Sequence, residues 1–214
     1  MKTLIAIPCM DMVHTDFMRS CLGMKLEGEV QYTFAQASLI YDGRNTLAKI
    51  AVNNGFDRVL WLDSDMQFGP DLFRALSADL DEGREIVSAL YFSRKPPIKP
   101  VAYKTCRINA AGIPEAESFR DFPPAEIFPV AACGFGAVMM TTELLRRVQD
   151  RFGLPFSPAY GFGEDLSFCM RVSELGETVW CDSRIRPGHV GTCVYDESAF
   201  RAQTGHEEKE EKHD

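Results

Sequence analysis

The chain has 214 residues, 45% of them hydrophobic, and a formal net charge of −8. This length and composition allow one globular domain with a sizeable core, and the negative charge argues against nucleic acid as a partner. There is no run of about 20 apolar residues and no N-terminal signal pattern, so we expect neither an integral membrane segment nor a secretory leader.

The cysteines indicate the cellular location of the protein, and the C-terminal residues indicate where its domain ends. The seven cysteines are scattered, and no two of them form a Cys-x-x-Cys pair. An odd, scattered set argues against a disulfide framework and against a structural zinc site, so the expected location is the reducing cytoplasm. Residues 206–214 hold five acids, two lysines and no apolar side chain. We therefore expect one domain over residues 1–205, followed by an acidic tail that stays solvated or disordered.

Strands and helices alternate along the first part of the chain. The predicted elements are a strand over 3–7, a helix over 13–25, a strand over 30–35, a helix over 44–54 and a strand over 59–62. Pro8 stops the first strand, and residues 41–45 are predicted to form a turn that opens the second helix. This alternation predicts an α/β fold with a parallel sheet and right-handed crossovers.

The second part of the chain is less regular. The predicted elements are a helix over 70–79, a strand over 85–90, short strands near 101–104 and 127–130, an apolar strand ending at 140, helices over 142–151 and 165–175, and a strand over 178–181. Three prolines make residues 93–100 a basic loop. Residues 186–191 are predicted to form a turn.

The two aspartates Asp63 and Asp65 follow the strand Val59–Leu62. Four apolar residues in a row suit a strand covered on both faces, and ligands bind at the carboxyl ends of such strands. Two close carboxylates repel unless a proton or a cation intervenes. We therefore predict a divalent metal, Mg²⁺ or Mn²⁺, which usually arrives with phosphate oxygens. The alternative is a pair of aspartates that caps the following turn.

Two further motifs carry candidate site residues. Glu164 and Asp165 start a helix behind a Gly-x-Gly turn with Tyr160 and Phe162 beside them. Helix capping explains acids in this position, but the glycines and aromatic rings also suit a sugar ligand. His189 lies in a glycine-rich turn. It is either a packed or surface histidine or a ligand for an Mn²⁺-class ion.

Arg44 and two glycines complete the set of candidates. Arg44 starts a helix after Asp42-Gly43, where a guanidinium and backbone amides suit a phosphate, although a surface helix start is equally common. Gly134 and Gly136 precede an apolar strand, so they do not form the dinucleotide fingerprint. We expect them to let a ligand pass close to the backbone.

The order of these motifs resembles a known family. The matching segments are Pro8 at the end of the first strand, Asp63-Ser64-Asp65, Cys133-Gly134-Phe135-Gly136, Gly163-Glu164-Asp165 and His189-x-Gly191. Together they resemble nucleotide-sugar glycosyltransferases of the GT-A fold, in particular small family-2-like members of bacteria and their phages. The resemblance covers roughly residues 1–195. It implies a single-domain GT-A fold, with a Rossmann-like, mostly parallel sheet flanked by helices.

The resemblance also implies a donor and a metal. The donor is a nucleotide-diphospho-sugar, with a UDP-sugar favoured, and Mn²⁺ or Mg²⁺ lies on its two phosphates. Asp65 is the expected metal ligand, Asp63 holds the metal or its waters or the donor ribose, and His189 completes the metal shell. The residues expected to contact the donor are Pro8, Arg44, Asp63, Ser64, Gly134 and Gly136.

For catalysis, the resemblance makes Asp165 the base that deprotonates an acceptor hydroxyl, with Glu164 orienting the acceptor or the base. Inversion at the sugar is expected, and retention stays open. The loop 93–100 and the segment after Gly191 are candidate lids, because donor hydrolysis must be limited by excluding water. The acceptor, the nucleobase, the donor sugar and the oligomeric state stay open.

Three other readings use the same residues. A phosphatase of the haloacid dehalogenase type would use Asp63 as nucleophile, but Gln67 stands where that family has Thr or Val. A nucleotidyltransferase would need a glycine-rich, basic loop after the first strand, and Met10-Asp11-Met12 offers none. A non-catalytic nucleotide-sugar binder would keep Asp63 and Asp65 and need no base.

Overall fold

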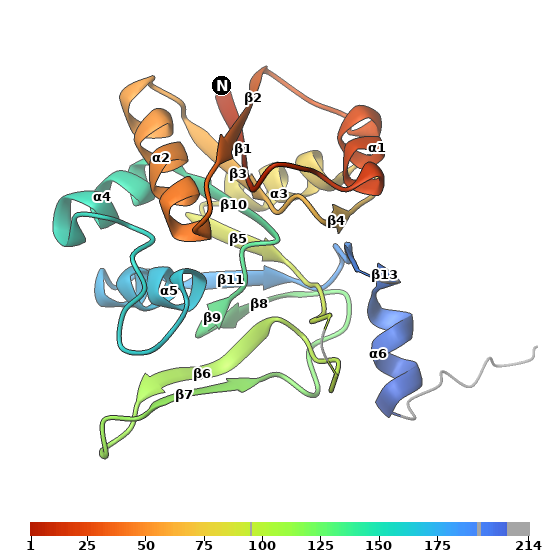
Figure 1. Cartoon of the computed structure of the whole chain (residues 1–214), viewed down its shortest axis with the longest axis vertical. Helices are drawn as coiled ribbons and strands as arrows, with labels where there is room; N and C mark the ends of the chain where they lie inside the picture. The colour runs from red at the N-terminus through yellow and green to blue at the C-terminus, as the bar shows by residue number, and fades with distance from the viewer. Residues whose placement is uncertain (95, 192–193, 205–214) are drawn as a thin grey trace, which may run out of the picture.

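A central sheet with helices on both faces organises the molecule (Figure 1). The computed structural model describes residues 1–94, 96–191 and 194–204. The elements of the first half are β1 (Lys2–Cys9), α1 (Thr15–Gly23), β2 (Glu29–Gln36), α2 (Ile40–Asn53), β3 (Arg58–Leu62), β4 (Met66–Gln67), α3 (Leu72–Asp81) and β5 (Ile86–Ala89). Those of the second half are β6 (Ala102–Ile108), β7 (Pro114–Ser118), β8 (Ile127–Val130), β9 (Ala132–Cys133), β10 (Ala137–Thr141), α4 (Thr142–Phe152), α5 (Glu164–Glu174), β11 (Val179–Asp182), β12 (Gly188–Val190), β13 (Val194–Tyr195) and α6 (Glu197–Thr204).

The seven strands of the main sheet follow the order β2-β1-β3-β10-β5-β11-β8. β1 pairs parallel with β2 and β3, and β11 pairs parallel with β5. β10 runs antiparallel between β3 and β5, and β8 is an antiparallel edge strand. The predicted α/β class, a mostly parallel sheet flanked by helices, is confirmed. Because β1, β2, β3 and β5 point the same way, their carboxyl ends meet at one edge of the sheet.

The apolar strands at the centre pack on both faces. Leu4, Ala6 and Trp61 belong to the core beneath α2, α4 and α5, whereas their neighbours Ile5 and Leu60 belong to the core beneath α1 and α3. Successive side chains of a strand point to opposite faces. The continuous apolar runs of β1 and β3 therefore follow from a sheet that is covered on both sides.

Helix α2 starts earlier than expected, because the predicted turn at 41–45 lies inside it. Gly43 made that segment resemble a turn. In the structure a Cβ at Gly43 would lie 3.4 Å from the carbonyl oxygen of Ala35 and 3.5 Å from Cβ of Pro8. The glycine therefore permits a close approach between α2 and the ends of β1 and β2, and does not interrupt the helix.

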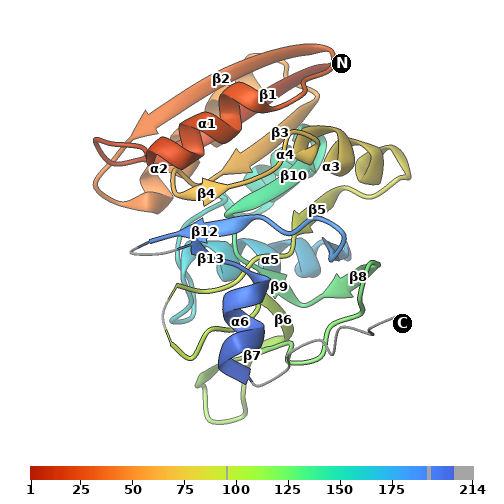
Figure 2. The ribbon, with the colours of Figure 1, turned by 90° about the vertical axis from the view of Figure 1, so that its right-hand side faces the viewer.

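The C-terminal part departs from the expectation in two places. The predicted turn at 186–191 contains β12, which pairs antiparallel with both β4 and β13, side by side in Figure 2. β6 and β7 form an exposed hairpin, of which only the start of β6 was predicted.

No helix among the described residues is long and apolar enough to cross a membrane. The predicted tail over 206–214 lies outside the described residues, so it stays a prediction.

Candidate functional site

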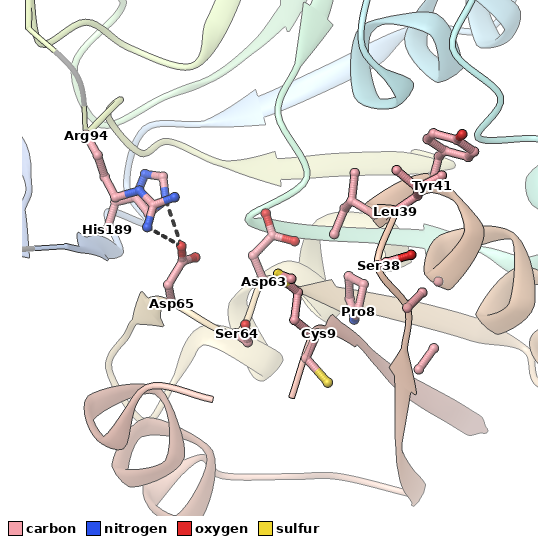
Figure 3. Close-up of a pocket in the computed structure, with 15 residues that line it drawn as sticks. Pro8, Cys9, Ser38, Leu39, Tyr41, Asp63, Ser64, Asp65, Arg94 and His189 are labelled. Carbon is pink, nitrogen blue, oxygen red and sulfur yellow. Dashed lines mark ion pairs between the residues drawn. The ribbon is translucent and has the colours of Figure 1, made fainter. Parts of the chain in front are cut away.

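A cavity of about 570 Å³ opens at the carboxyl ends of β1, β2 and β3. Figure 3 shows Ser38, Leu39 and Tyr41 at one end of it and Asp65, Arg94 and His189 at the other. Pro8, Cys9, Asp63 and Ser64 lie between the two ends. Of the predicted site residues, the cavity therefore gathers Pro8, Asp63, Ser64, Asp65 and His189 from three separate stretches of the chain.

Asp65 and His189 face each other across 3.5 Å, measured from Oδ2 to Nε2. The other ring nitrogen of His189, Nδ1, lies 3.0 Å from the carbonyl oxygen of Phe92. A carbonyl only accepts hydrogen bonds, so Nδ1 carries a hydrogen and donates it. Nε2 then faces the Asp65 carboxylate, as a hydrogen donor in the imidazolium or with its lone pair directed to a shared cation in the neutral ring. Such a pair is stabilised by a shared proton or a shared cation.

Backbone hydrogen bonds fix the spacing of this pair. The N–H of Val190 donates to the carbonyl oxygen of Asp65 at 2.8 Å, and His189 is paired in register with Met66. The carbonyl oxygen of Ser64 accepts from the N–H of His14 at 3.0 Å. Asp65 and His189 are thus held by the β4–β12 ladder, although the chain between them contains most of the second half of the fold.

Asp63 is held differently, by a buried arginine. Nη2 of Arg44 lies 2.7 Å from Oδ1 of Asp63, and its Nε lies 3.3 Å from Oε1 of Glu164. The Arg44 side chain is only 2% exposed, and its guanidinium lies 5.3 Å from the ring centre of Phe135. Arg44 does not line the cavity. Its position makes it a link between two site carboxylates, so the predicted contact of Arg44 with the nucleotide stays a prediction that would require the side chain to move.

The two aspartates differ in their proton affinity. Burial raises the pKa of Asp63, and the Arg44 charge only partly offsets that effect. Burial also acts to raise the pKa of Asp65, but the hydrogen bond and charge of His189 and the charge of Arg94 outweigh it and lower the pKa. Asp65 therefore keeps its negative charge at neutral pH, as a metal ligand must.

Asp165 lies in the first turn of α5, where its Oδ1 accepts from the N–H of Leu166 at 2.7 Å. Burial, followed by the negative charge of Glu164, raises the pKa of Asp165 to about 6. A carboxylate with this pKa is mostly charged at pH 7 and is a stronger base than an ordinary aspartate. Neither Glu164 nor Asp165 lines the cavity, and Arg44 connects Glu164 to Asp63 at the cavity floor.

A tyrosine explains the two glycines. A Cβ at Gly134 would lie 2.1 Å from Oη of Tyr91, and one at Gly136 would lie 2.8 Å from its Cζ. The Tyr91 hydroxyl accepts from the N–H of Gly136 at 3.2 Å, and its ring packs edge-on against His189. Neither glycine lines the cavity, so the predicted contact with the donor sugar stays a prediction. Packing against Tyr91 is sufficient to require glycine at both positions.

Sequence reasoning missed two residues of the site, Tyr91 and Arg94. Both follow β5, whose carboxyl end reaches the same edge of the sheet as that of β3. A polar residue just after the strand predicted over 85–90 is the available signal, but the sequence predicts residues 93–100 only as a basic loop and a candidate lid. The hydroxyl of buried Tyr91 has a pKa well above its usual range, because burial opposes its ionisation.

The described residues contain no group of three or more His, Cys, Asp or Glu side chains that could hold a metal ion. Asp65 and His189 supply two ligands of mixed oxygen and nitrogen type. Mg²⁺ and Mn²⁺ sites commonly use one or two protein groups and take their remaining ligands from substrate phosphates and water. The residues present therefore fit a metal that binds together with a phosphate-bearing ligand, and they do not form a closed metal cage.

Comparison with known proteins supports the fold. No family model matches the sequence, and no curated protein matches it. Among solved structures, A197 from STIV is 18% identical, with a TM-score of 0.63 over 89% of this chain and 86% of that one. A structure of GalNAc-T7 with UDP, GalNAc and Mn²⁺ is 11% identical, with a TM-score of 0.62 over 89% of this chain and 44% of that one. At these identities the likeness concerns the fold, which is GT-A-like.

Proposed function

We propose that the protein is a metal-dependent glycosyltransferase, which moves a sugar from a nucleotide-diphospho-sugar to an acceptor hydroxyl. The observation that carries the proposal is the Asp65–His189 pair at one end of a cavity on the carboxyl edge of the sheet. The cavity volume lies within the usual range for small-molecule sites. The similar structure of GalNAc-T7 contains UDP, GalNAc and Mn²⁺, which supports the same ligand class.

The two ends of the cavity suit the two ends of a nucleotide-sugar. Leu39 and Tyr41 offer apolar and aromatic surface to a nucleobase, with Pro8 beside them. Asp65 and His189 lie at the opposite end, where the diphosphate would bind together with Mn²⁺ or Mg²⁺. Asp65 and His189 would hold a divalent ion there, and its charge would offset the charge that develops on the leaving diphosphate. We favour a UDP-sugar as donor.

In this proposal Asp165 is the base. Its carboxylate accepts the proton of the acceptor hydroxyl, whose oxygen then bonds to the anomeric carbon as the bond from that carbon to the diphosphate breaks. Attack from the opposite side inverts the sugar. A pKa of about 6 keeps Asp165 charged near neutral pH while leaving it basic enough to accept the proton. Glu164, held by Arg44, orients the acceptor or the base.

Calorimetry with UDP-, GDP- and CDP-sugars, each with and without Mn²⁺, tests the donor. We expect one nucleotide class to bind, and only when the metal is present. The variant Asp65→Asn should lose this binding, whereas Asp165→Asn should keep it and lose sugar transfer or donor hydrolysis. Absence of binding to all three classes would contradict the proposal.

The same variants separate the alternatives. A non-catalytic binder would show full function in Asp165→Asn. A phosphatase with Asp63 as nucleophile would hydrolyse a generic phosphomonoester and lose that activity in Asp63→Asn. Asp71→Asn is the matched control, because Asp71 is exposed and paired with Lys25 outside the cavity. It should behave as the wild type in every assay.

A further inference from the structure

The positively charged guanidinium of Arg94 pairs with Asp65, the proposed metal ligand. Its Nη1 lies 2.6 Å from Oδ2 of Asp65 and donates to the carbonyl oxygen of Val190 at 3.2 Å. Figure 3 shows the guanidinium and the His189 ring converging on the same carboxylate. Oδ2 of Asp65 is also the oxygen that faces Nε2 of His189. A metal shared by Asp65 and His189 would therefore need the place that Arg94 occupies.

The position of Arg94 allows it to leave. Its side chain is 45% exposed and lies on the proline-rich segment after β5, at the surface of the cavity. Both of its described polar partners, Asp65 and Val190, lie at the metal end of the cavity. A guanidinium released from Asp65 would remain next to any diphosphate bound there, and this group pairs well with phosphate oxygens.

We infer that Arg94 is an internal counter-ion that competes with the divalent metal for Asp65. Without donor, the guanidinium occupies the carboxylate and keeps the affinity for free metal low. When a nucleotide diphosphate brings the metal, Arg94 exchanges its carboxylate partner for phosphate oxygens. Arg94 thereby couples the binding of metal and donor. Either ligand favours the separation of Arg94 from Asp65, and the other ligand then binds without having to break that ion pair. This inference rests on the metal site of the proposed function.

The sign of the expected effect makes the inference testable without any turnover. If Arg94 competes with the metal, removing it should tighten the binding of Mn²⁺ alone. We expect the dissociation constant for Mn²⁺ in Arg94→Met to fall on the order of tenfold relative to the wild type, within the usual range of coupling between two ligands. The measurement is a titration in which the paramagnetic resonance signal of free Mn²⁺ reports the unbound ion.

Two further variants make the comparison specific. Arg186→Met removes the same charge close to β12, but Arg186 pairs with Glu197 and does not contact Asp65. It should change Mn²⁺ affinity less than about twofold, since exposed charges act weakly at a distance. Asp65→Asn removes the carboxylate itself and should weaken Mn²⁺ binding in both the wild-type and the Arg94→Met background. Thermal unfolding of each variant confirms that it is folded.

The outcomes separate the inference from the proposed function. Tighter binding in Arg94→Met alone, lost again with Asp65→Asn, supports it. Unchanged or weaker Mn²⁺ binding in Arg94→Met, together with loss of binding in Asp65→Asn, overturns the role of Arg94 and leaves the metal site standing. Equal tightening in Arg186→Met would show a general charge effect and would also overturn it. If no variant binds Mn²⁺, with or without UDP, both the inference and the metal of the proposed function are wrong.

Discussion

Two arginine–aspartate contacts lie almost side by side in this molecule, and they differ in burial far more than in length. Arg44 contacts Asp63 at 2.7 Å and Arg94 contacts Asp65 at 2.6 Å. The Arg44 side chain is 2% exposed, whereas that of Arg94 is 45% exposed. Breaking a buried pair leaves an uncompensated charge in a poorly solvated place, but an exposed pair exchanges with water at little cost. Contact distance alone therefore does not tell a structural pair from an exchangeable one.

The contrast indicates different roles for the two aspartates, which are separated in the sequence only by Ser64. Asp63 is tied through Arg44 to Glu164, and therefore joins the end of β3 to the start of α5. Asp65 faces the cavity, and its charge is shared between Arg94 and His189. We interpret the first as the fixed floor of the site and the second as the part that exchanges partners.

The largest effect is expected from breaking the buried contact. Arg44→Met would leave Asp63 and Glu164 without their common partner, and we expect a loss of about 3 to 5 kcal/mol in the free energy of unfolding. Urea denaturation measures it. Arg107→Met is the control, because it removes an exposed pair with Glu115 and should cost less than about 1 kcal/mol. Equal losses of stability in Arg44→Met and Arg107→Met would contradict the view that the buried ion pair of Arg44 contributes more than an exposed one.

The next effect concerns the exchangeable contact. Asp65→Asn keeps the shape of the side chain but removes the charge that a cation needs. We expect Mn²⁺ affinity in the presence of the bound nucleotide to fall by at least about a hundredfold, or about 2.7 kcal/mol, with little change in stability. Isothermal titration calorimetry provides the affinity, and Asp71→Asn provides the control. Retained Mn²⁺ affinity would place the metal elsewhere.

Asp165→Asn should stabilise the protein while it removes transfer. The pKa of Asp165 is raised from 3.8 to about 6, so folding favours the protonated form. The stability that this preference provides is complete below pH 3.8 and is lost as pH rises through about 6. At pH 7.5 the neutral amide of Asp165→Asn avoids that loss, and we expect a gain of at most about 3 kcal/mol in the free energy of unfolding.

The pH dependence is the control for this prediction. The difference in unfolding free energy between Asp165→Asn and the wild type should grow from pH 4 to pH 7 and then become constant. A difference that is the same at both ends of this range would mean that the titration of Asp165 is not its cause. Transfer by the wild type should correspondingly fall as pH drops below about 6, because Asp165, the proposed base, becomes protonated.

The smallest effect concerns Tyr91, which contacts His189 through its ring and is connected to Asp63 through Gly136. Its hydroxyl accepts from the N–H of Gly136, and the carbonyl oxygen of Gly136 accepts from the N–H of Asp63 at 3.1 Å. Tyr91→Phe leaves a buried N–H without its partner, so we expect a loss of about 1 to 2 kcal/mol in chemical denaturation. Tyr160→Phe, with an exposed ring, should change stability by less than about 0.5 kcal/mol. A loss of the same size in Tyr160→Phe would contradict this explanation.

Burial patterns explain why much of the fold was predictable. The strands at the centre of the sheet are continuous apolar runs, because helices cover both faces, and such runs are visible in a sequence. The β6–β7 hairpin is exposed and lacks that pattern, so most of it was missed. The antiparallel direction of β10 depends on pairing with β3 and β5 and leaves no local signal.

For the site, residue types were predictable, but their partners were not. The chemistry of their side chains and their positions in the sequence predict Asp63, Asp65 and His189 as site residues. In the structure all three line one cavity. Arg44 was expected at the nucleotide, yet its burial turns the guanidinium toward carboxylates, and burial of a side chain at a helix start cannot be read from its neighbours in sequence. Arg94 was seen only as part of a basic loop, because its contact with Asp65 depends on the path of the chain after β5.

The β4–β12 ladder has a consequence for how the site comes into being. Asp65 is made early during translation and His189 late, and the two become neighbours only when residues 188–190 dock against 66–67. Contacts so distant in sequence form slowly, because a long loop must close first. A growing chain therefore has most of its sheet before it has the Asp65–His189 pair that we propose as metal ligands. In refolding experiments, Mn²⁺ binding should consequently appear after the bulk of the secondary structure.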